Sequence, residues 1–299
     1  MEPIDIVIPY VNFNDSHWQY YYHLYKPNCG PGQRFRETNT LKFQLRSIEK
    51  NLPWIRNVYL ILAYETQIPK WLNPEAKGLK IVYHKDYIPK QFLPTFNSNV
   101  IELFFNKLEG LSDKFIASND DMIFTKENPV EWYFQGDRPV YNITIKKDFK
   151  LKSNQLFDHI VYRNAKLANE FCATGEMLKP ADKHLPMPHI KRVWDDIWTQ
   201  YSKTLLDSIK LSKFRKPYNV SHWLFSYICI LSGLTVHKDY DAAGYCSVRD
   251  DINYDYVYKK IHNHPVVCLN DSIHQKTFWW NTITDILEEI FPEKSKFEL

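Results

Sequence analysis

Apolar residues in the first 150 positions fall alternately into short continuous runs and into stripes with helical spacing. Four short runs are typical of buried strands, namely residues 4–11, 58–63, 79–83 and 115–118. Between them, residues 39–52 and 98–108 repeat apolar side chains three and four positions apart, which predicts amphipathic helices. Thr38 or Asn39 is the expected N-cap of the first helix. This alternation predicts an α/β fold with a mostly parallel sheet flanked by helices.

The second half of the chain is less regular and richer in histidine and aromatic residues. Helices are expected at 194–210, 221–231 and 278–291, the last of them closed by Pro292. No internal repeat interrupts the sequence, so we predict a single unit over residues 1–299. In it, an α/β half (1–150) binds the ligand and a mainly helical half (151–299) completes the site.

Composition excludes several classes of protein. Of the 299 residues, 44% are hydrophobic and only 8 are glycine, which fits a packed globular protein and not a disordered or collagen-like one. The formal net charge of +3 is too small to indicate a nucleic-acid partner. Five scattered cysteines without a C-x-x-C motif indicate reduced thiols and not a disulfide framework.

The sequence also bears on location. The first residues lack the basic-then-apolar pattern of a secretory signal, and no apolar stretch reaches the roughly 20 residues of a membrane span. We therefore expect a cytoplasmic protein, placed at the inner face of the cell membrane only by peripheral contact. The aromatic helix at 278–291 has two interpretations, docking on a membrane or partner and packing into the core, and the pattern favours the core.

Two oxygen-rich turns follow apolar runs, at Asn119-Asp120-Asp121 and Asn270-Asp271. Ligands of open α/β sheets bind beyond the carboxyl ends of the strands, where the first turn and the one after Val11 are expected to meet. Carboxylate and amide oxygens there suit Mg²⁺ or Mn²⁺ held against a diphosphate. The competing interpretation of each turn is local, because Asn and Asp favour turns for their own hydrogen bonding.

Three further segments carry candidate chemistry. His184 and His189 flank prolines that would stiffen a loop and hold an imidazole for proton transfer. The alternative interpretation of this segment is an ordinary surface loop. Arg215 precedes a predicted helix and is placed either to clamp a phosphate or to lie in a solvated basic segment. Glu102 is either an active-site carboxylate or a surface charge. A Walker loop, a G-x-G-x-x-G motif and a nucleophilic-serine elbow are all missing from the sequence, which excludes ordinary kinases, nicotinamide enzymes and serine hydrolases.

Several strings of residues occur together in a characteristic order. They are DIVIPYVN at 5–12, RFR at 34–36, LRSIEKNLPWI at 45–55, LPTFNSN at 93–99, NDD at 119–121, HLP at 184–186 with Arg215, CLND at 268–271 and FPEKSKFE at 291–298. In this order the strings resemble the Stealth family. That family includes bacterial capsular and exopolysaccharide phosphotransferases and the animal lysosomal-enzyme GlcNAc-1-phosphotransferase.

The resemblance implies a GT-A-like fold and a sugar-1-phosphate transferase. Such an enzyme moves hexose- or HexNAc-1-phosphate from a UDP-sugar to an acceptor sugar hydroxyl and releases UMP, in the synthesis of phosphodiester-linked capsular or exopolysaccharide. The acceptor would be a growing polysaccharide or a lipid-linked oligosaccharide. Two alternatives stay open: a metal-dependent glycosyltransferase that releases UDP, and a carbohydrate-binding protein without turnover.

The resemblance also implies roles for particular residues. The expected catalytic residues are Glu102, Asp121, His184 and Arg215, with His189 as the alternative histidine. The expected residues of the donor pocket are Asp5, Asn12, Arg34, Arg36 and Asn97. The expected ligands of Mg²⁺ or Mn²⁺ are Asp120, Asp121, Asn270 and Asp271.

Overall fold

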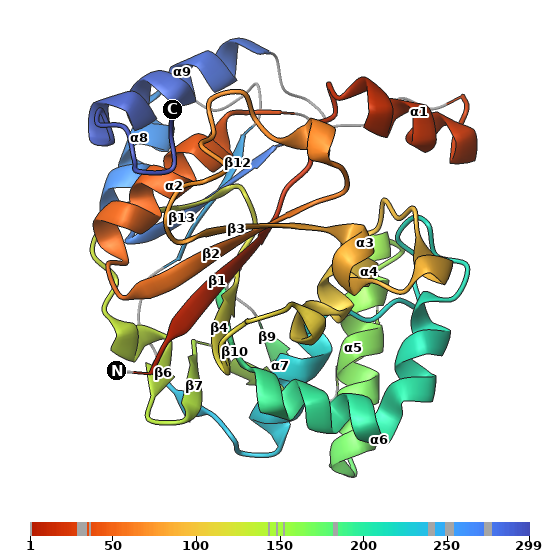
Figure 1. The fold of residues 1–299 in the computed structure, drawn as a ribbon. Helices are drawn as coiled ribbons and strands as arrows, with labels where there is room; N and C mark the ends of the chain where they lie inside the picture. The colour runs from red at the N-terminus through yellow and green to blue at the C-terminus, as the bar shows by residue number, and fades with distance from the viewer. Residues whose placement is uncertain are drawn as a thin grey trace.

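The computed structural model describes residues 2–28, 35, 37–142, 144–147, 149–151, 153–181, 185–238, 243–248, 254–271 and 277–299. Its centre is a five-stranded sheet in the order β10-β4-β1-β2-β3 (Figure 1). These strands are β1 (Ile4–Pro9), β2 (Ile55–Leu62), β3 (Leu79–Tyr83), β4 (Lys114–Ala117) and β10 (Met187–Ile190). The first four run parallel and β10 is antiparallel to β4, which confirms the predicted mostly parallel sheet.

One face of this sheet packs on α2 (Thr40–Asn51). Ile6 and Ile8 of β1 point to that face, where they join Leu45 and Ile48 of the helix in one buried cluster. Asn39 stands at the N-cap position as expected, but it makes no capping hydrogen bond through its side chain. Its φ of 59° places it in the left-handed region, which asparagine tolerates better than most residues.

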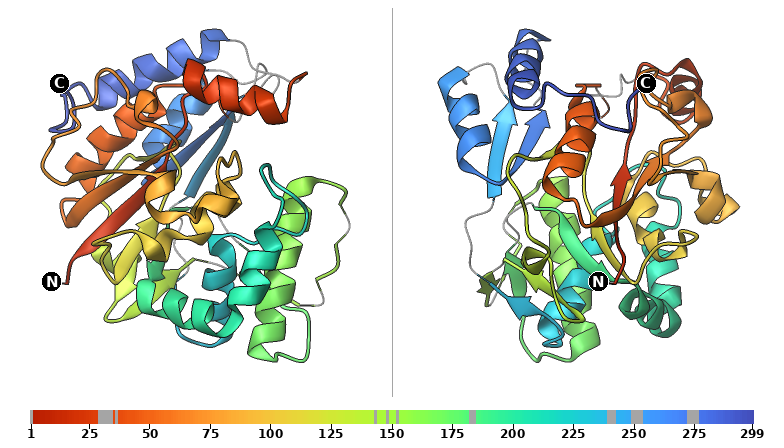
Figure 2. Two further views of the ribbon diagram at one scale, coloured as in Figure 1. Left: turned by 45° about the vertical axis from the view of Figure 1, so that its right-hand side comes forward. Right: turned by 60° about the vertical axis from the view of Figure 1, so that its left-hand side comes forward.

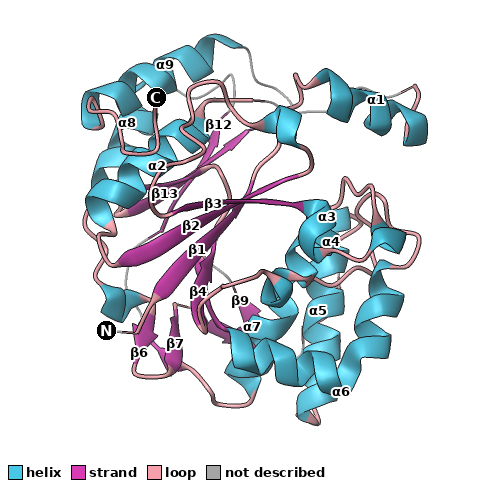
Figure 3. Ribbon diagram, viewed as in Figure 1, coloured by secondary structure: helices cyan, strands magenta, loops and turns pink. Residues whose placement is uncertain are grey.

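The other face packs on α4 (Ser98–Leu103), α5 (Leu156–Cys172), α6 (Lys191–Ile209) and α7 (His222–Leu231), which gather on one side in Figures 1 and 3. Val7 of β1 points into this second cluster. α4 is shorter than predicted, because the backbone leaves helical geometry at Phe104 and continues as a 3-10 turn. The break allows the adjacent Phe104 and Phe105 both to be buried, whereas neighbours in a regular helix point about 100° apart.

A second sheet has the order β12-β13-β5 and was not predicted as a sheet. Its strands are β12 (Ala243–Val248), β13 (Val266–Asp271) and β5 (Met122–Phe124). Two helices, α8 (Tyr254–Asn263) and α9 (Thr277–Ile290), cover it and pack Val257, Ile261, Ile283 and Leu287 into its core (Figure 2). Trp280 of α9 is also buried in this core, as the core interpretation of the aromatic helix expects.

The remaining elements lie outside the two main sheets and the helices already described. They are the helices α1 (Ser16–Tyr25) and α3 (His84–Tyr87), the 3-10 turns Glu65–Gln67, Lys90–Phe92, Phe105–Lys107 and Val130–Trp132, and the strands β6 (Phe134–Gln135), β7 (Arg138–Tyr141), β8 (Thr144–Lys146), β9 (Lys179–Ala181) and β11 (Val236–His237). Across the described ranges, no helix has both the length and the apolar composition that crossing a bilayer requires.

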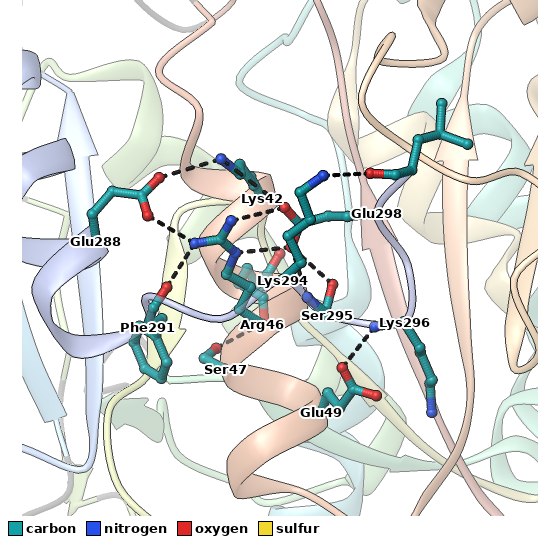
Figure 4. Close-up of polar contacts among 12 residues, drawn as sticks. Lys42, Arg46, Ser47, Glu49, Glu288, Phe291, Lys294, Ser295, Lys296 and Glu298 are labelled. Carbon is teal, nitrogen blue, oxygen red and sulfur yellow. Dashed lines mark hydrogen bonds and ion pairs between the residues drawn. The ribbon is translucent and has the colours of Figure 1, made fainter.

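The segment after α9 returns to α2 and is fastened there by a polar network (Figure 4). Arg46 of α2 donates from Nε and Nη2 to the carboxylate of Glu298, at 2.8 and 2.9 Å. Its Nη1 donates to Glu288 at 2.9 Å and to the carbonyl of Phe291 at 2.6 Å. The Ser295 backbone N–H also donates to Glu298, at 2.8 Å. The segments 45–55 and 291–298, which the sequence analysis singled out separately, are therefore in contact with each other, away from the cleft described next.

Candidate active site

A cleft of about 940 Å³ opens at the carboxyl ends of β1 and β4. Pro9, Tyr10 and Val11 at the end of β1, and the turn Asn119-Asp120-Asp121 after β4, form part of its wall. β1 lies between β2 and β4: the chain adds β2 and β3 on one side of β1 and then crosses over to add β4 on the other side. Ligands of open α/β sheets bind at such a switch point. The expectation that the two turns share this edge is confirmed.

Negative charge is concentrated around the first acidic turn. Desolvation raises the pKa of Asp120 well above its ordinary value of 3.8, and the carboxylates of Asp121 and Glu37 raise it further. Glu37 also accepts a short hydrogen bond from the Tyr10 hydroxyl. Carboxylates crowded in this way are the environment that a divalent cation stabilises.

The second oxygen-rich pair lies beside the first turn, but Asn270 and Asp271 are the last two residues of β13 and do not form the predicted turn. The backbone N–H of Leu269 donates to the carbonyl of Asp121 at 2.8 Å, and the thiol of Cys268 donates to its carboxylate at 3.5 Å. Asn270 and Asp271, the next two residues, line the same cleft as Asp121. The short strand β5 follows the acidic turn directly and pairs with β13, which brings the acidic turn next to the end of β13.

These donors suit a hard cation that is also held by its substrate. Among the residues with described positions, no three His, Cys, Asp or Glu side chains are placed to hold a metal ion by themselves. Mg²⁺ in phosphate-transfer sites usually has one or two carboxylate ligands, and substrate phosphates and water complete its coordination. The oxygen set of Asp120, Asp121, Asn270 and Asp271 fits this mode of binding.

Arg215 lines the cleft, and its Nη2 donates to the Ser98 hydroxyl at 2.5 Å. Asn97 is fully buried and fixes this segment: its Nδ2 lies 3.1 Å from the carbonyl oxygen of Ser212 and 3.2 Å from that of Phe214. Asn97 itself is not part of the cleft wall formed by the described residues, although the resemblance implied that it binds the donor. It holds the segment that carries Arg215.

Glu102 lines the cleft and pairs with a histidine that the sequence analysis missed. Its Oε2 lies 2.9 Å from Nδ1 of His222, the first residue of α7. Both residues also line a small hollow of about 30 Å³, together with Ser118 and Asn119. The only local signal for this position is Ser221, which caps the helix.

His189 is a core residue beside this pair. It is 2% exposed, stacks on Phe115 and accepts a hydrogen bond at Nδ1 from the Trp194 indole at 3.3 Å. Burial lowers the pKa of His189 well below 6.5, and His222 lowers it further. The other candidate histidine, His184, lies outside the described residues.

Asp5 requires a correction. It lies at the beginning of β1, whereas the cleft opens beyond the other end of that strand. Its carboxylate is fully buried and accepts hydrogen bonds from the Arg56 guanidinium at 2.9 and 2.5 Å and from the Ser112 N–H at 2.8 Å. The physical reason for the error is that a buried carboxylate needs partners, and a structural guanidinium supplies them as well as a ligand would.

Asn12 follows β1 but is not in the described cleft wall either. Its side-chain oxygen accepts a hydrogen bond from the Asn14 N–H at 2.8 Å, which is a local turn contact. Its carbonyl accepts one at 3.2 Å from Gln67, which does line the cleft. Arg34 and Arg36 lie outside the described residues.

An aromatic wall at one end of the cleft was also missed. It consists of Trp18, Tyr22, Phe35, Phe96 and Phe214. Phe96 and Phe214 stack with ring centroids 5.4 Å apart, and the ammonium of Lys26 lies 5.2 Å from the Phe214 ring centroid. The contributing segments are far apart in sequence, so no local pattern identifies this wall.

Comparison with known proteins gives consistent similarities. Residues 34–141 match the family description "Stealth protein CR2, conserved region 2". The capsular polysaccharide phosphotransferase WcwK of Streptococcus pneumoniae is 31% identical, over 99% of this chain and 98% of its own length. The receptor polysaccharide phosphotransferase WefC of Streptococcus gordonii is 27% identical over the full length of both chains. A capsular polysaccharide phosphotransferase of Actinobacillus suis is 27% identical over 92% of this chain and 78% of its own.

Proposed function

Because the chain belongs to the Stealth family, whose members compared here are polysaccharide phosphotransferases, we propose that it transfers a sugar 1-phosphate from a UDP-sugar to an acceptor sugar hydroxyl and releases UMP. The product is a phosphodiester within a capsular or exopolysaccharide. The observation that carries this proposal is the cleft at the switch point of the sheet, where the acidic turn after β4 and the end of β13 face the same space as Arg215.

The wall of the cleft divides into regions that suit the parts of such a donor. In the aromatic wall, Trp18, Tyr22 and Phe96 are buried, while the partly buried Phe35 and Phe214 leave ring surface against which a uracil base would stack. Arg215 presents a guanidinium, which binds phosphate oxygens through two parallel hydrogen bonds. The acidic turn and the end of β13, chiefly Asp121 with Asp120, Asn270 and Asp271, would hold Mg²⁺ or Mn²⁺. The bound ion neutralises charge on the phosphates.

The reaction requires in-line displacement at the β-phosphorus. The acceptor oxygen forms a bond to this phosphorus while the bond to the bridging oxygen breaks, and UMP leaves with the electron pair. Arg215 binds the charge on the phosphates, and Asn97 holds the backbone that carries Arg215. We place this step in the cytoplasm, in keeping with the four cysteines of the described chain, all unbridged.

The test is to identify the nucleotide that is released. The purified protein is incubated with Mg²⁺ or Mn²⁺, a panel of UDP-sugars and a polysaccharide fragment, and the nucleotide product is separated by chromatography. Release of UMP with phosphorus incorporated into the acceptor supports the proposal. Release of UDP with a new glycosidic bond would instead identify a glycosyltransferase and overturn it.

A further inference from the structure

We propose that His222 is the general base that deprotonates the acceptor hydroxyl, and that Glu102 positions its ring. This inference rests on the proposed phosphotransfer and adds a proton acceptor to it. Removing a proton from an attacking hydroxyl accelerates such reactions by about 10²–10⁴-fold. A base therefore has to lie next to the phosphates and be held in one orientation.

The contact with Glu102 fixes the chemical form of the imidazole. Because an ionised carboxylate only accepts hydrogen bonds, the 2.9 Å contact makes Nδ1 of His222 the donor. In the neutral ring, Nε2 then carries the lone pair and is the atom that takes up a proton. Glu102 also stabilises the positive charge that appears on the ring after proton transfer, as a carboxylate does in a catalytic triad.

Packing holds the ring in place. His222 begins α7 directly after the capping Ser221, and its ring lies edge-on to His189 at 5.7 Å between centroids. The Trp223 ring lies 5.6 Å away at 63°. Glu102 comes from α4, where only 7% of its surface is exposed. The side chain of Glu102 is 10% exposed and that of His222 is 14% exposed. This exposure is enough for both to reach the cleft, while water is largely excluded.

The pair lies at the place where an acceptor would meet the donor. Both side chains border the small hollow that Ser118 and Asn119 also line, and the acidic turn continues from there into Asp120 and Asp121. Glu102 borders the large cleft as well. Among the described residues, the titratable groups in contact with the His222 ring are Glu102 from α4 and His189 from β10. Burial lowers the pKa of His189 well below 6.5, so this neighbour is neutral.

The proposed step balances in atoms and charge. Nε2 of His222 takes the acceptor hydroxyl proton as the acceptor oxygen bonds to the β-phosphorus. UMP departs with the electron pair of the broken bond, and the imidazolium returns its proton to solvent. His189 is unsuited to this role, because its ring is sealed in the core and its Nδ1 is already bonded to Trp194.

The experiment compares the full-length protein with the variants His222→Gln and Glu102→Gln across pH, with nucleotide release and acceptor phosphorylation as readouts. His262→Gln is the matched control: this half-buried histidine also uses Nδ1 in a hydrogen bond, at 2.9 Å to the Tyr258 carbonyl, and is not in the cleft wall. Circular dichroism and calorimetric binding of UDP establish that each variant is folded and holds nucleotide.

We expect His222→Gln to lower kcat by about 10²–10⁴-fold with UDP affinity unchanged, and to abolish the fall in rate that acidification causes in the wild type. Glu102→Gln should lower kcat by about tenfold or more, and imidazole should partly restore His222→Ala. A folded His222→Gln protein with the wild-type rate and pH profile would overturn the assignment of His222 while UMP release still upheld the proposed function. Release of UDP by the wild type would overturn both.

Discussion

Arg46 and Glu298 lie 252 positions apart in the chain and form a two-point ion pair, in which the side chains are only 5% and 2% exposed. Hydrogen bonds from Arg46 lower the pKa of Glu298, although desolvation opposes that shift. The pair connects the helix beneath the central sheet to the last segment of the chain. The pair is structural, and no substrate is needed to explain it.

Breaking this pair should destabilise the protein without impairing the cleft. Glu298→Gln leaves the buried guanidinium poorly compensated, so we expect the free energy of unfolding to fall by about 3 kcal/mol. Glu170→Gln is the control, because its ion pair with Lys166 is about half exposed and contributes about 0.5 kcal/mol or less. Urea denaturation measures both. Equal effects of the two changes would refute the assigned role of Arg46–Glu298.

The acidic turn should be needed for turnover and not for folding. Asp121→Ala is expected to lower kcat by on the order of 10²-fold or more, because charge on the reacting phosphates loses its compensation. EDTA should abolish wild-type activity, and added Mg²⁺ or Mn²⁺ should restore it. The assay is nucleotide release, with circular dichroism as the check on folding. Near-normal turnover of folded Asp121→Ala would remove this residue from the site.

Asn97 should affect catalysis through Arg215. In Asn97→Asp, an oxygen replaces the amide donor and faces the carbonyls of Ser212 and Phe214, so the Arg215 segment should shift and kcat/KM fall by about tenfold or more. Asn128→Asp is the control, since its buried amide also donates to two carbonyls but lies outside the described cleft wall. Both variants should lose stability. A similar loss of kcat/KM in the two would contradict the positioning role.

A substitution of Asp5 distinguishes a structural role, which the buried contacts indicate, from the donor-binding role that the family resemblance implied. Asp5→Ala leaves the buried Ser112 N–H without its acceptor and removes the ion pair of the partly exposed Arg56, so it should lower the free energy of unfolding by about 1–3 kcal/mol. The KM for the donor should not change in the folded fraction. Steady-state kinetics below the unfolding temperature give this value. An increase of several-fold in KM would return Asp5 to the donor pocket.

Two buried histidines should make the protein sensitive to acid. Burial lowers the pKa of His84 from 6.5 to about 3, and that of His189 also lies well below 6.5. Below pH 6.5 the unfolded chain therefore binds protons that the folded protein does not, and stability falls by up to about 1.4 kcal/mol per pH unit for each histidine. His84→Gln should make this decline shallower. Denaturation at pH 7.5 and 5.5 measures it, and an unchanged slope would argue against a buried neutral His84.

The sequence predicted those parts of the fold that have a local signature. The four parallel strands of the central sheet and α2 were found to within a few residues, because buried runs and helical stripes are visible in short windows. The antiparallel strand β10 was predicted as part of a loop. The second sheet was missed. β5 has three residues, and it pairs with β13 about 140 positions later, so no window contains both partners. The turn Asn119-Asp120-Asp121 was recognised because it directly follows β4, whereas Asn270 and Asp271, also predicted as a turn, are the last residues of β13.

The site itself was only partly predictable. Glu102 was identified, but its partner His222 lies 120 positions away and follows an ordinary helix cap. Asp5 and Asn97 were assigned to the donor pocket on the family resemblance alone. Their actual contacts are with buried protein groups, which a linear sequence does not distinguish from substrate. The sequence indicates which polar residues are buried, but only the three-dimensional packing shows which groups they contact.

The position of Glu298 has a consequence for biosynthesis. During synthesis the N-terminal part of a chain leaves the ribosome first. The guanidinium of Arg46 therefore has no Glu298 carboxylate to pair with until residue 298 has been added, and Phe297 completes the apolar cluster that contains Leu45. The nascent chain must carry an incomplete central layer until these residues have been made. Chaperones that shield this layer should matter more for the yield of this protein than for one whose sheet closes early.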